Sequence, residues 1–92
     1  MLIIRYSSAY KKSYKRLSRS GKFPRKEVDE VIKFIQRGEK LDSIYRDHRL
    51  SGDMANNREC HIRSDLLLIY RIEENKLVLV LVNLGSHTDL FE

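Results

Sequence analysis

The amino-acid sequence predicts an α+β fold in which a helical hairpin lies on an antiparallel sheet. A short apolar run at the N-terminus is followed by two segments with the apolar period of amphipathic helices. Three apolar runs separated by short turn sequences come later, as in a three-stranded meander. The predicted order is therefore an N-terminal strand, a helical hairpin and a three-stranded antiparallel meander, within a single domain that spans residues 1–92.

The first strand and the first helix are predicted from residues 2–19. Residues 2–6 are apolar and partly β-branched, which favours a strand. Ser7 or Ser8 can cap a helix that runs to about residue 19, because a serine hydroxyl accepts a backbone N–H bond. Gly21 is the expected stop. One stripe of this helix is aromatic and apolar, at Tyr10, Tyr14 and Leu17.

A second helix is predicted between Pro24 and Gly38. Proline suits the first turn of a helix, where its missing N–H is not needed. Glycine at the other end provides the C′ residue that many helices require. The apolar residues between them recur with the spacing of one buried face, at Val28, Val31, Ile32 and Ile35.

The C-terminal half predicts a loop and then the meander. Residues 39–57 have no clean period, and their glycine and asparagines indicate turns. Strands are expected at about residues 58–62, 65–72 and 76–84. The last two are almost continuously apolar at Leu66–Tyr70 and Leu77–Val82, so they are predicted to be central and covered on both faces.

The composition excludes several classes of protein. No apolar run approaches the length of about 20 residues that a membrane-spanning helix needs, so no membrane association is expected. The single cysteine, Cys60, rules out an internal disulfide and fits a reducing cytosol. One cysteine and three scattered histidines do not match the ligand pairs of a structural zinc site. We therefore expect a cytoplasmic, unprocessed protein without a metal or cofactor.

Positive charge is concentrated at the N-terminus. Residues 1–26 hold nine of the 18 Lys and Arg residues and none of the 13 Asp and Glu residues. Such a block predicts contact with a polyanion or an acidic protein. The alternative is a solvated basic face of the first helix. The residues predicted to contact RNA in this block are Lys11, Lys12, Lys15 and Arg16.

All three histidines lie near the predicted ends of strands or in loops, at His48, His61 and His87. Histidine can act as acid or base at neutral pH because its unperturbed pKa is about 6.5. A tight link between two strands would bring Asp65 close to His61. The sequence thus allows a cluster of the three histidines and Asp65. The alternative is three unrelated surface histidines and an aspartate that only begins a strand.

Metal-free cleavage of RNA is one reaction that such a cluster can perform. The ribose 2′-oxygen must lose a proton before it attacks phosphorus, and the departing 5′-oxygen must gain one. Imidazolium or guanidinium groups can stabilise the charge that develops at phosphorus. Phe91 can supply a stacking surface for a base. Its alternative role is to fill the core.

Three ordered motifs together resemble the YafQ branch of the RelE/ParE toxin superfamily. They read Tyr45-Arg-Asp-His48-x-Leu50-x-Gly52, Arg58-Glu-Cys-His61-Ile-x-x-Asp65-x-Leu-Leu-Ile-Tyr70 and Gly85-Ser-His87-x-x-Leu90-Phe91. The resemblance covers the C-terminal half, and the N-terminal strand and helical hairpin agree with it in layout. It implies a RelE-like fold.

The resemblance also implies a function. The chain would be the toxin of a bacterial type II toxin–antitoxin system that cleaves messenger RNA on the ribosome. A cognate antitoxin encoded beside it would neutralise it, and operator DNA would be contacted only through the antitoxin complex. The implied active residues are His48, His61, Asp65, His87 and Phe91. We assign His48 as general base and His87 as general acid, with His61 and Asp65 orienting the site.

The sequence departs from the family pattern at Asn83, where members usually carry arginine. Arg46, Arg49 or Arg63 can supply the missing charge, and Arg46 and Arg49 are also predicted to contact RNA. Two alternatives remain: a ParE-like toxin that inhibits DNA gyrase by protein binding, and a site-impaired toxin kept for its antitoxin partnership. The histidine set favours the nuclease, because protein binding alone does not need it.

Overall fold

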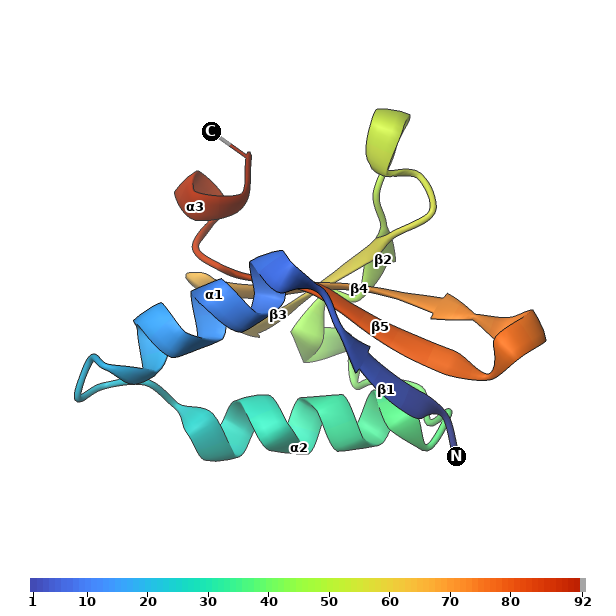
Figure 1. The fold of residues 1–92 in the computed structure, drawn as a ribbon, viewed down its shortest axis with the longest axis horizontal. Helices are drawn as coiled ribbons and strands as arrows, with labels where there is room; N and C mark the ends of the chain where they lie inside the picture. The colour runs from blue at the N-terminus through green and yellow to red at the C-terminus, as the bar shows by residue number, and fades with distance from the viewer. Residues whose placement is uncertain (92) are drawn as a thin grey trace.

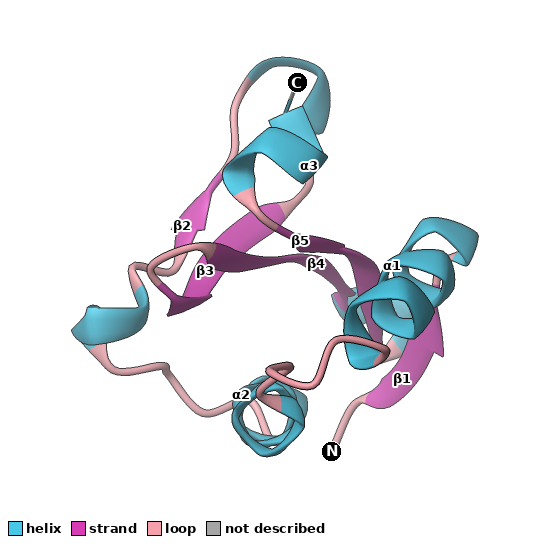
Figure 2. Cartoon of the chain, turned by 90° about the vertical axis from the view of Figure 1, so that its left-hand side faces the viewer, coloured by secondary structure: helices cyan, strands magenta, loops and turns pink. Residues whose placement is uncertain are grey.

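The computed structural model describes residues 1–91 as a curved five-stranded sheet with helices on both sides (Figures 1 and 2). Three short 3-10 turns lie in the connections: η1 (Ser43–Tyr45) precedes β2, η2 (Gly52–Met54) lies between β2 and β3, and η3 (Glu74–Lys76) lies between β4 and β5. The helices and strands are β1 (Ile3–Tyr6), α1 (Ser8–Ser18), α2 (Arg25–Gln36), β2 (His48–Arg49), β3 (Arg58–Arg63), β4 (Leu66–Glu73), β5 (Val78–Gly85) and α3 (His87–Phe91).

The strands lie in the order β1-β5-β4-β3-β2. The N-terminal β1 runs parallel to β5, and the other neighbours are antiparallel. The predicted α+β fold is confirmed, because the first strand joins the meander in one sheet and the helical hairpin packs on it. The predicted strand boundaries differ from the observed ones by one or two residues.

The start of α1 is as predicted and its end lies within one residue of the prediction, but Gly21 does not have the predicted role. Ser7 caps the helix, and its Oγ accepts a hydrogen bond from the backbone N–H of Tyr10 at 3.0 Å. The helix ends at Ser18, before Gly21. Gly21 does not adopt the left-handed conformation that favours glycine at a helix end, and it lies in the turn between the two helices.

The α2 helix buries all four residues of its predicted apolar face. Pro24 precedes its first residue instead of lying in its first turn. Gly38 ends the helix as predicted, with a φ of 78°. The N–H of Gly38 donates to the carbonyl of Ile35 at 3.0 Å, and the N–H of Glu39 donates to that of Phe34 at 3.1 Å. This is the paired hydrogen-bond pattern of a glycine C-terminal motif.

The two faces of the central strands have different neighbours, as their alternation requires. Cys60, Leu68 and Tyr70 belong to the core that the helices cover. Leu67 and Ile69 point to the opposite face and are also buried. The prediction that the central strands are covered on both faces is thus confirmed.

Two regular elements were not predicted. The two-residue strand β2 interrupts the expected loop at residues 39–57, and the five-residue helix α3 follows β5. Both lie on the side of the sheet away from α2 (Figure 2). Over residues 1–91, no helix is both long enough and apolar enough to cross a membrane.

Candidate active site

The register of the sheet places four polar side chains, those of His48, Glu59, His61 and Asn83, on the face away from α2. His48 pairs with Glu59, Glu59 with Ile69, and Ile69 with Asn83. The next row on the same face joins His61, Leu67 and Gly85. Side chains of directly opposed residues point to the same side of a sheet. Two histidines, a carboxylate and an amide therefore share one face.

Glu59 connects two of the histidines. Its Oε1 lies 3.5 Å from the Nε2 atom of His48 and 3.5 Å from that of His61. The two imidazole rings are 6.5 Å apart between centroids. Glu59 is only 5% exposed, so its carboxylate is held between the rings and shielded from water. We call His48, Glu59 and His61 the histidine–glutamate cluster.

The orientation of the His48 ring follows from its hydrogen bond. Nδ1 lies 2.7 Å from the backbone carbonyl of Arg46. A carbonyl oxygen only accepts, so Nδ1 must carry the hydrogen of this bond. Arg46 itself has a left-handed φ of 52°, which turns the chain just before the strand. Nε2 is therefore the nitrogen left to exchange a proton, and it faces Glu59 and the open side of the sheet.

The role predicted for Asp65, orienting the site beside His61, stays a prediction. Asp65 lies exposed in the turn between β3 and β4, and within residues 1–91 it forms no hydrogen bond or ion pair. The reason is that β3 continues past His61 to Arg63, with an irregularity in register between them. His61 shares its face with Glu59, two residues earlier. The simple turn role describes Asp65 in this structure.

The third histidine begins α3, on the other side of the same face. The ring of His87 lies 5.0 Å from that of Phe91, one turn later. Phe91 is 37% exposed, so it does not fill the core. The two rings together form an accessible aromatic surface at the end of β5.

Several contacts hold α3 in place. The backbone N–H of Asp89 donates to Ser86 Oγ, and the N–H of Ser86 donates to Asp89 Oδ2, each at 3.0 Å. The Ser86 backbone N–H keeps the pKa of Asp89 below its usual value. Arg16 Nη2 on α1 lies 3.5 Å from the same carboxylate oxygen. At Gly85, an added Cβ would approach the Asp89 side chain to 3.0 Å, so α3 packs closely on the strand.

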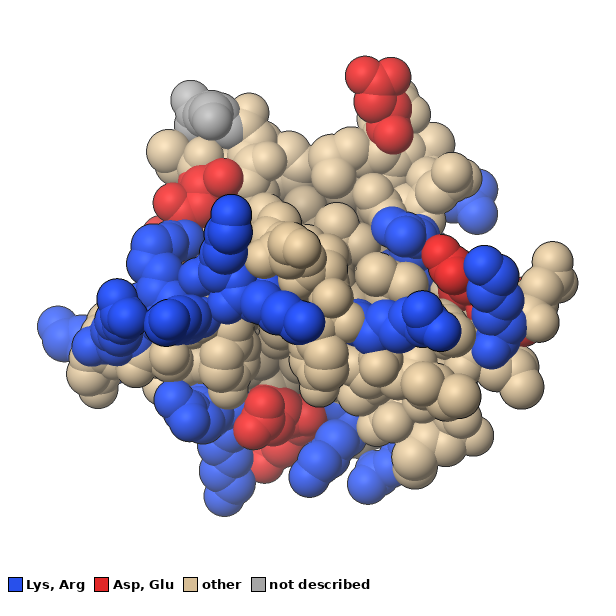
Figure 3. Space-filling model, in the orientation of Figure 1, with Lys and Arg blue, Asp and Glu red and all other residues tan. Residues whose placement is uncertain are grey.

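The site thus has two walls on one face of the sheet. The histidine–glutamate cluster lies over β2 and β3, and His87 and Phe91 stand beyond β5, with the buried Leu67 and Ile69 between them. Neighbouring strands are about 4.8 Å apart, so β3 and β5 are separated by roughly 10 Å. Figure 3 shows a hollow at the upper margin of the molecule, between the surfaces over α3 and over the loop that follows β2.

Other ionisable groups near the sheet are poorly suited to proton transfer at neutral pH. Burial raises the pKa of the Cys60 thiol to about 12, so it stays protonated. Burial, together with a hydrogen bond to Asp47, also raises the pKa of Tyr70. Arg58 Nε donates to the same aspartate at 2.9 Å. Cys60 and Tyr70 belong to the hydrophobic core, and Arg58 and Tyr70 both bind Asp47, which lies just before β2.

The predicted RNA-contacting basic residues are exposed. Lys11, Lys12, Lys15 and Arg16 lie on α1, where Figure 3 shows a dense band of positive charge. Arg46 and Arg49 are exposed on either side of His48. Arg63 differs, because it forms two hydrogen bonds to Glu27 at 2.7 and 2.8 Å. It is therefore not available to replace the arginine that the family usually carries at position 83.

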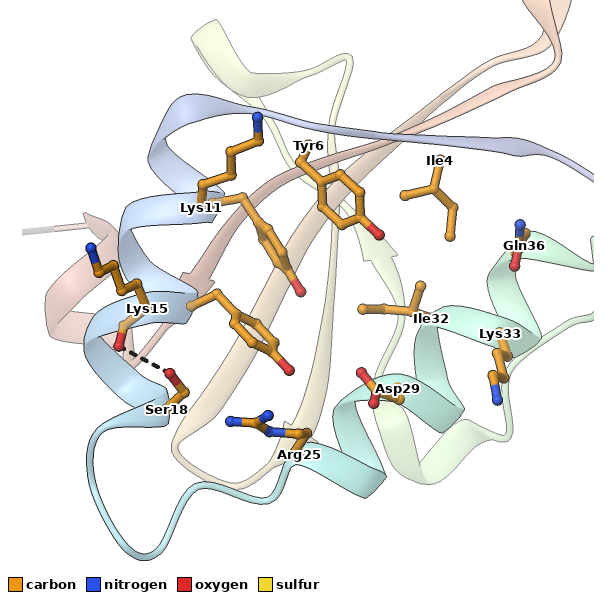
Figure 4. A pocket seen from close by; sticks show the side chains of 12 residues that line it. Ile4, Tyr6, Lys11, Lys15, Ser18, Arg25, Asp29, Ile32, Lys33 and Gln36 are labelled. Carbon is orange, nitrogen blue, oxygen red and sulfur yellow. Dashed lines mark hydrogen bonds between the residues drawn. The ribbon is translucent and has the colours of Figure 1, made fainter.

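A large cavity lies away from the histidines, between α1, α2 and β1 (Figure 4). Its volume is about 680 Å³. Tyr6, Tyr10 and Tyr14 line it in succession, with ring centroids 5.8 and 5.9 Å apart, and Lys11 and Arg25 stand at its rim. No histidine lines it, so it offers no group for acid–base chemistry near neutral pH.

Comparisons with known proteins agree with the resemblance. The family model "Bacterial toxin of type II toxin-antitoxin system, YafQ" matches residues 2–92. The mRNA interferase toxin YafQ of Escherichia coli K12 is 30% identical over 88 residues, which cover 96% of this chain and 94% of that protein. A crystal structure of a metal-bound toxin from Helicobacter pylori has a TM-score of 0.92 and 40% identity, with 99% of this chain and 100% of that chain covered. The Escherichia coli DinJ–YafQ complex contains a chain with a TM-score of 0.87 and 26% identity, with full coverage of both chains.

Proposed function

The chain belongs to the YafQ family of bacterial toxins from type II toxin–antitoxin systems, and we propose that it cleaves messenger RNA on the ribosome. The Escherichia coli relative is an mRNA interferase, which supports endoribonuclease activity here. The observation that carries the proposal is the histidine–glutamate cluster, which lies on the side of the sheet where α3 carries His87. The family assignment gives no support to the gyrase-inhibiting alternative.

The proposed reaction uses the protein's own acids and bases. His48 Nε2 takes the proton from the ribose 2′-oxygen, which attacks the adjacent phosphorus. His87 gives a proton to the departing 5′-oxygen as the phosphorus–oxygen bond breaks. The products are a 2′,3′-cyclic phosphate and a 5′-hydroxyl. Base and acid must approach from opposite sides of the phosphorus, and the two walls of the site allow this.

Glu59 takes the orienting role that the sequence suggested for Asp65. A carboxylate beside an imidazole fixes the ring and stabilises the imidazolium that forms during proton transfer. Because Oε1 is equally close to His48 and His61, it can serve both rings. His61 would then present a positive charge to the phosphate. We propose that Asp65 contributes little to the reaction.

The Glu59→Gln variant is therefore expected to lower the cleavage rate by about 10- to 100-fold, because a neutral amide cannot balance an imidazolium. The matched variant Asp65→Asn makes the same chemical change in the exposed turn between β3 and β4. It is expected to keep at least half of the cleavage rate. Rates are measured on one defined message at saturating substrate. A larger loss in Asp65→Asn than in Glu59→Gln would return the orienting role to Asp65.

RNA would be held by charge and by stacking. The exposed lysines of α1 and the pair Arg46 and Arg49 can neutralise backbone phosphates. Phe91, with His87 beneath it, can stack on a base. Stacking of this kind is worth about 1–3 kcal/mol and tolerates different bases.

We propose that a cognate antitoxin is the protein partner, since the similar YafQ chain of Escherichia coli forms a complex with DinJ. The tyrosine-lined cavity lies away from the proposed catalytic groups. An antitoxin bound there would leave the site face open, whereas one bound over α3 would cover it. Only the second mode would block the proposed catalytic groups directly, so the activity is tested on the chain without its antitoxin.

Expression without the antitoxin is expected to stop growth, with fragmentation of messenger RNA within minutes. The reason is that each positioned acid or base contributes about 100- to 10,000-fold to the rate of strand cleavage. Northern analysis of an abundant message and the supercoiling of a reporter plasmid are followed in the same cultures. Arrest with intact messages and altered supercoiling would favour the gyrase inhibitor. Continued growth with soluble, folded protein would favour the impaired toxin.

A further inference from the structure

We propose that Asn83 binds a phosphate oxygen of the RNA strand through its side-chain Nδ2, as an uncharged contact whose geometry Ser13 helps to fix. The inference rests on the proposed function, because it concerns the same face of the sheet. Asn83 lies on β5 in register with Ile69, and thus in the same row as Glu59 and His48. It is half-buried.

Two donors fix the orientation of the Asn83 amide. The backbone N–H of Leu84 donates to Oδ1 at 2.8 Å, and Ser13 Oγ donates to the same atom at 2.7 Å. A backbone N–H can only donate, so the atom facing it must be the amide oxygen. The Leu84 N–H therefore identifies the end of the amide that faces Ser13 as Oδ1. Ser13 lies on α1, so the helix beside β5 holds the amide in one orientation.

The fixed oxygen leaves the amide nitrogen free for a ligand. Nδ2 lies on the other side of the planar amide and therefore points away from Ser13. Within residues 1–91 it has no hydrogen-bond partner. It carries two N–H donors and no acceptor capacity. A half-buried donor pair on the site face is suited to an anionic oxygen.

The chemistry of the site favours phosphate as that ligand. A strand lying between the two walls passes over Leu67 and Ile69, next to Asn83. Its backbone offers an anionic oxygen at every nucleotide, whereas base edges vary along the message. A fixed donor therefore suits the backbone better than a base. Because an amide is neutral, this contact releases no counterion and adds nothing to the salt dependence of binding.

Binding to a short RNA that carries a 2′-deoxy nucleotide at the cleavage position tests the inference without requiring cleavage. Asn83→Asp and Asn83→Leu both remove the N–H donors, and each is expected to weaken binding about tenfold. Asn83→Arg restores a donor with charge, so it should bind at least as tightly as the parent and steepen the salt slope by about 0.7. Ser13→Ala, which loosens the amide, should fall between the parent and Asn83→Leu.

Asn75→Asp is the matched control, because it makes the same charge change in the exposed turn before β5. It should bind like the parent. Thermal unfolding of every variant shows whether the fold is kept, and Asn83→Asp keeps an acceptor for Ser13 and Leu84. Weakening by Asn83→Asp but not by Asn83→Leu would indicate charge repulsion alone and overturn the inference. So would parent-like binding by both.

The experiment also separates this inference from the proposed function. Cleavage is measured in parallel on a message in a programmed ribosome. Weaker binding by both variants, with no cleavage of that message by the parent, would support the Asn83 contact and refute the nuclease. Cleavage by the parent with parent-like binding of both variants would refute only the Asn83 contact. A parent that cleaves on the ribosome but binds no short RNA would also refute only the Asn83 contact.

Discussion

The His87→Ala variant is expected to lose RNA cleavage by about 100-fold or more while it keeps its fold. The 5′-oxygen leaves poorly as an alkoxide, so removal of the group that protonates it should slow bond breaking directly. His87 is exposed at the start of α3, and its main side-chain neighbour is Phe91 at 5.0 Å between ring centroids. The contacts that hold α3 come from Ser86, Asp89 and Arg16, which the substitution leaves unchanged.

The neighbouring Thr88→Ala provides the matched control, because Thr88 is exposed on the same short helix. It is expected to cleave at the parent rate. Both variants should unfold within about 0.5 kcal/mol of the parent, as is usual for exposed positions. Single-turnover cleavage and chemical denaturation measure the two quantities separately. A parent-like rate in His87→Ala would remove this residue from the mechanism. An equal loss in Thr88→Ala would show that α3 acts only as a structural element.

The sequence predicted the regular elements whose pattern repeats several times. Both long helices span about three turns, so the apolar repeat of each can be recognised in the sequence. In α2, Val28, Val31, Ile32 and Ile35 are all buried, as that repeat requires. The central strands were evident because a strand covered on both faces is almost continuously apolar. The parallel pairing of β1 with β5 could not be derived from periodicity, because pairing between distant segments leaves no local pattern.

The shortest elements were missed for the same physical reason. A strand of two residues such as His48–Arg49 has no period to detect, and the five residues of α3 complete little more than one turn. The prediction that Gly21 ends the first helix was wrong, because glycine also occurs in ordinary turns, where no left-handed backbone is needed. These errors matter for the site, since the missed elements carry His48 and His87.

Strand register decides which carboxylate shares a face with His61. Position along the chain suggested that a residue just after a hairpin would lie near His61. The structure instead joins His61 to Glu59, because residues two apart on a strand share a face. Glu59 looked like an ordinary charged strand residue. Alternation within the predicted strand was the signal that could have identified it, since Glu59 and His61 necessarily lie on one face.

Cleavage is expected to be much faster on a translating ribosome than on the same RNA free in solution. In-line attack requires the 2′-oxygen, phosphorus and 5′-oxygen to be aligned, and free RNA rarely holds this geometry. The site is an open face with two walls, and the side chain of His48 is 51% exposed. Such a face can supply acid and base but encloses the strand poorly. Full alignment of reactants is worth roughly 7–11 kcal/mol at the extreme, so partial alignment by the ribosome could dominate the rate.

The test compares one message, free and in a programmed ribosome, at the same toxin concentrations and salt. A variant with Lys11, Lys12, Lys15 and Arg16 replaced by Gln separates docking from alignment. If the basic face of α1 docks on ribosomal RNA, this variant needs more toxin to reach half of the maximal rate, and its affinity depends less steeply on salt. Its rate at saturation should be unchanged, because none of the four residues is proposed to touch the reacting atoms.

Comparing the two substrates and the two proteins shows whether the toxin or the ribosome aligns the reacting atoms. A high rate on the ribosome and a low rate on free RNA, with the Gln variant altered only in affinity, would mean that the toxin brings proton transfer and the ribosome brings geometry. Equal rates on both substrates would mean that the open face aligns RNA by itself, and ribosome dependence would have to be abandoned. A Gln variant slowed even at saturation would place the α1 charges in alignment as well as docking. The contact between Arg16 and Asp89 is the structural route for such an effect, because it links the basic helix to the helix that carries His87.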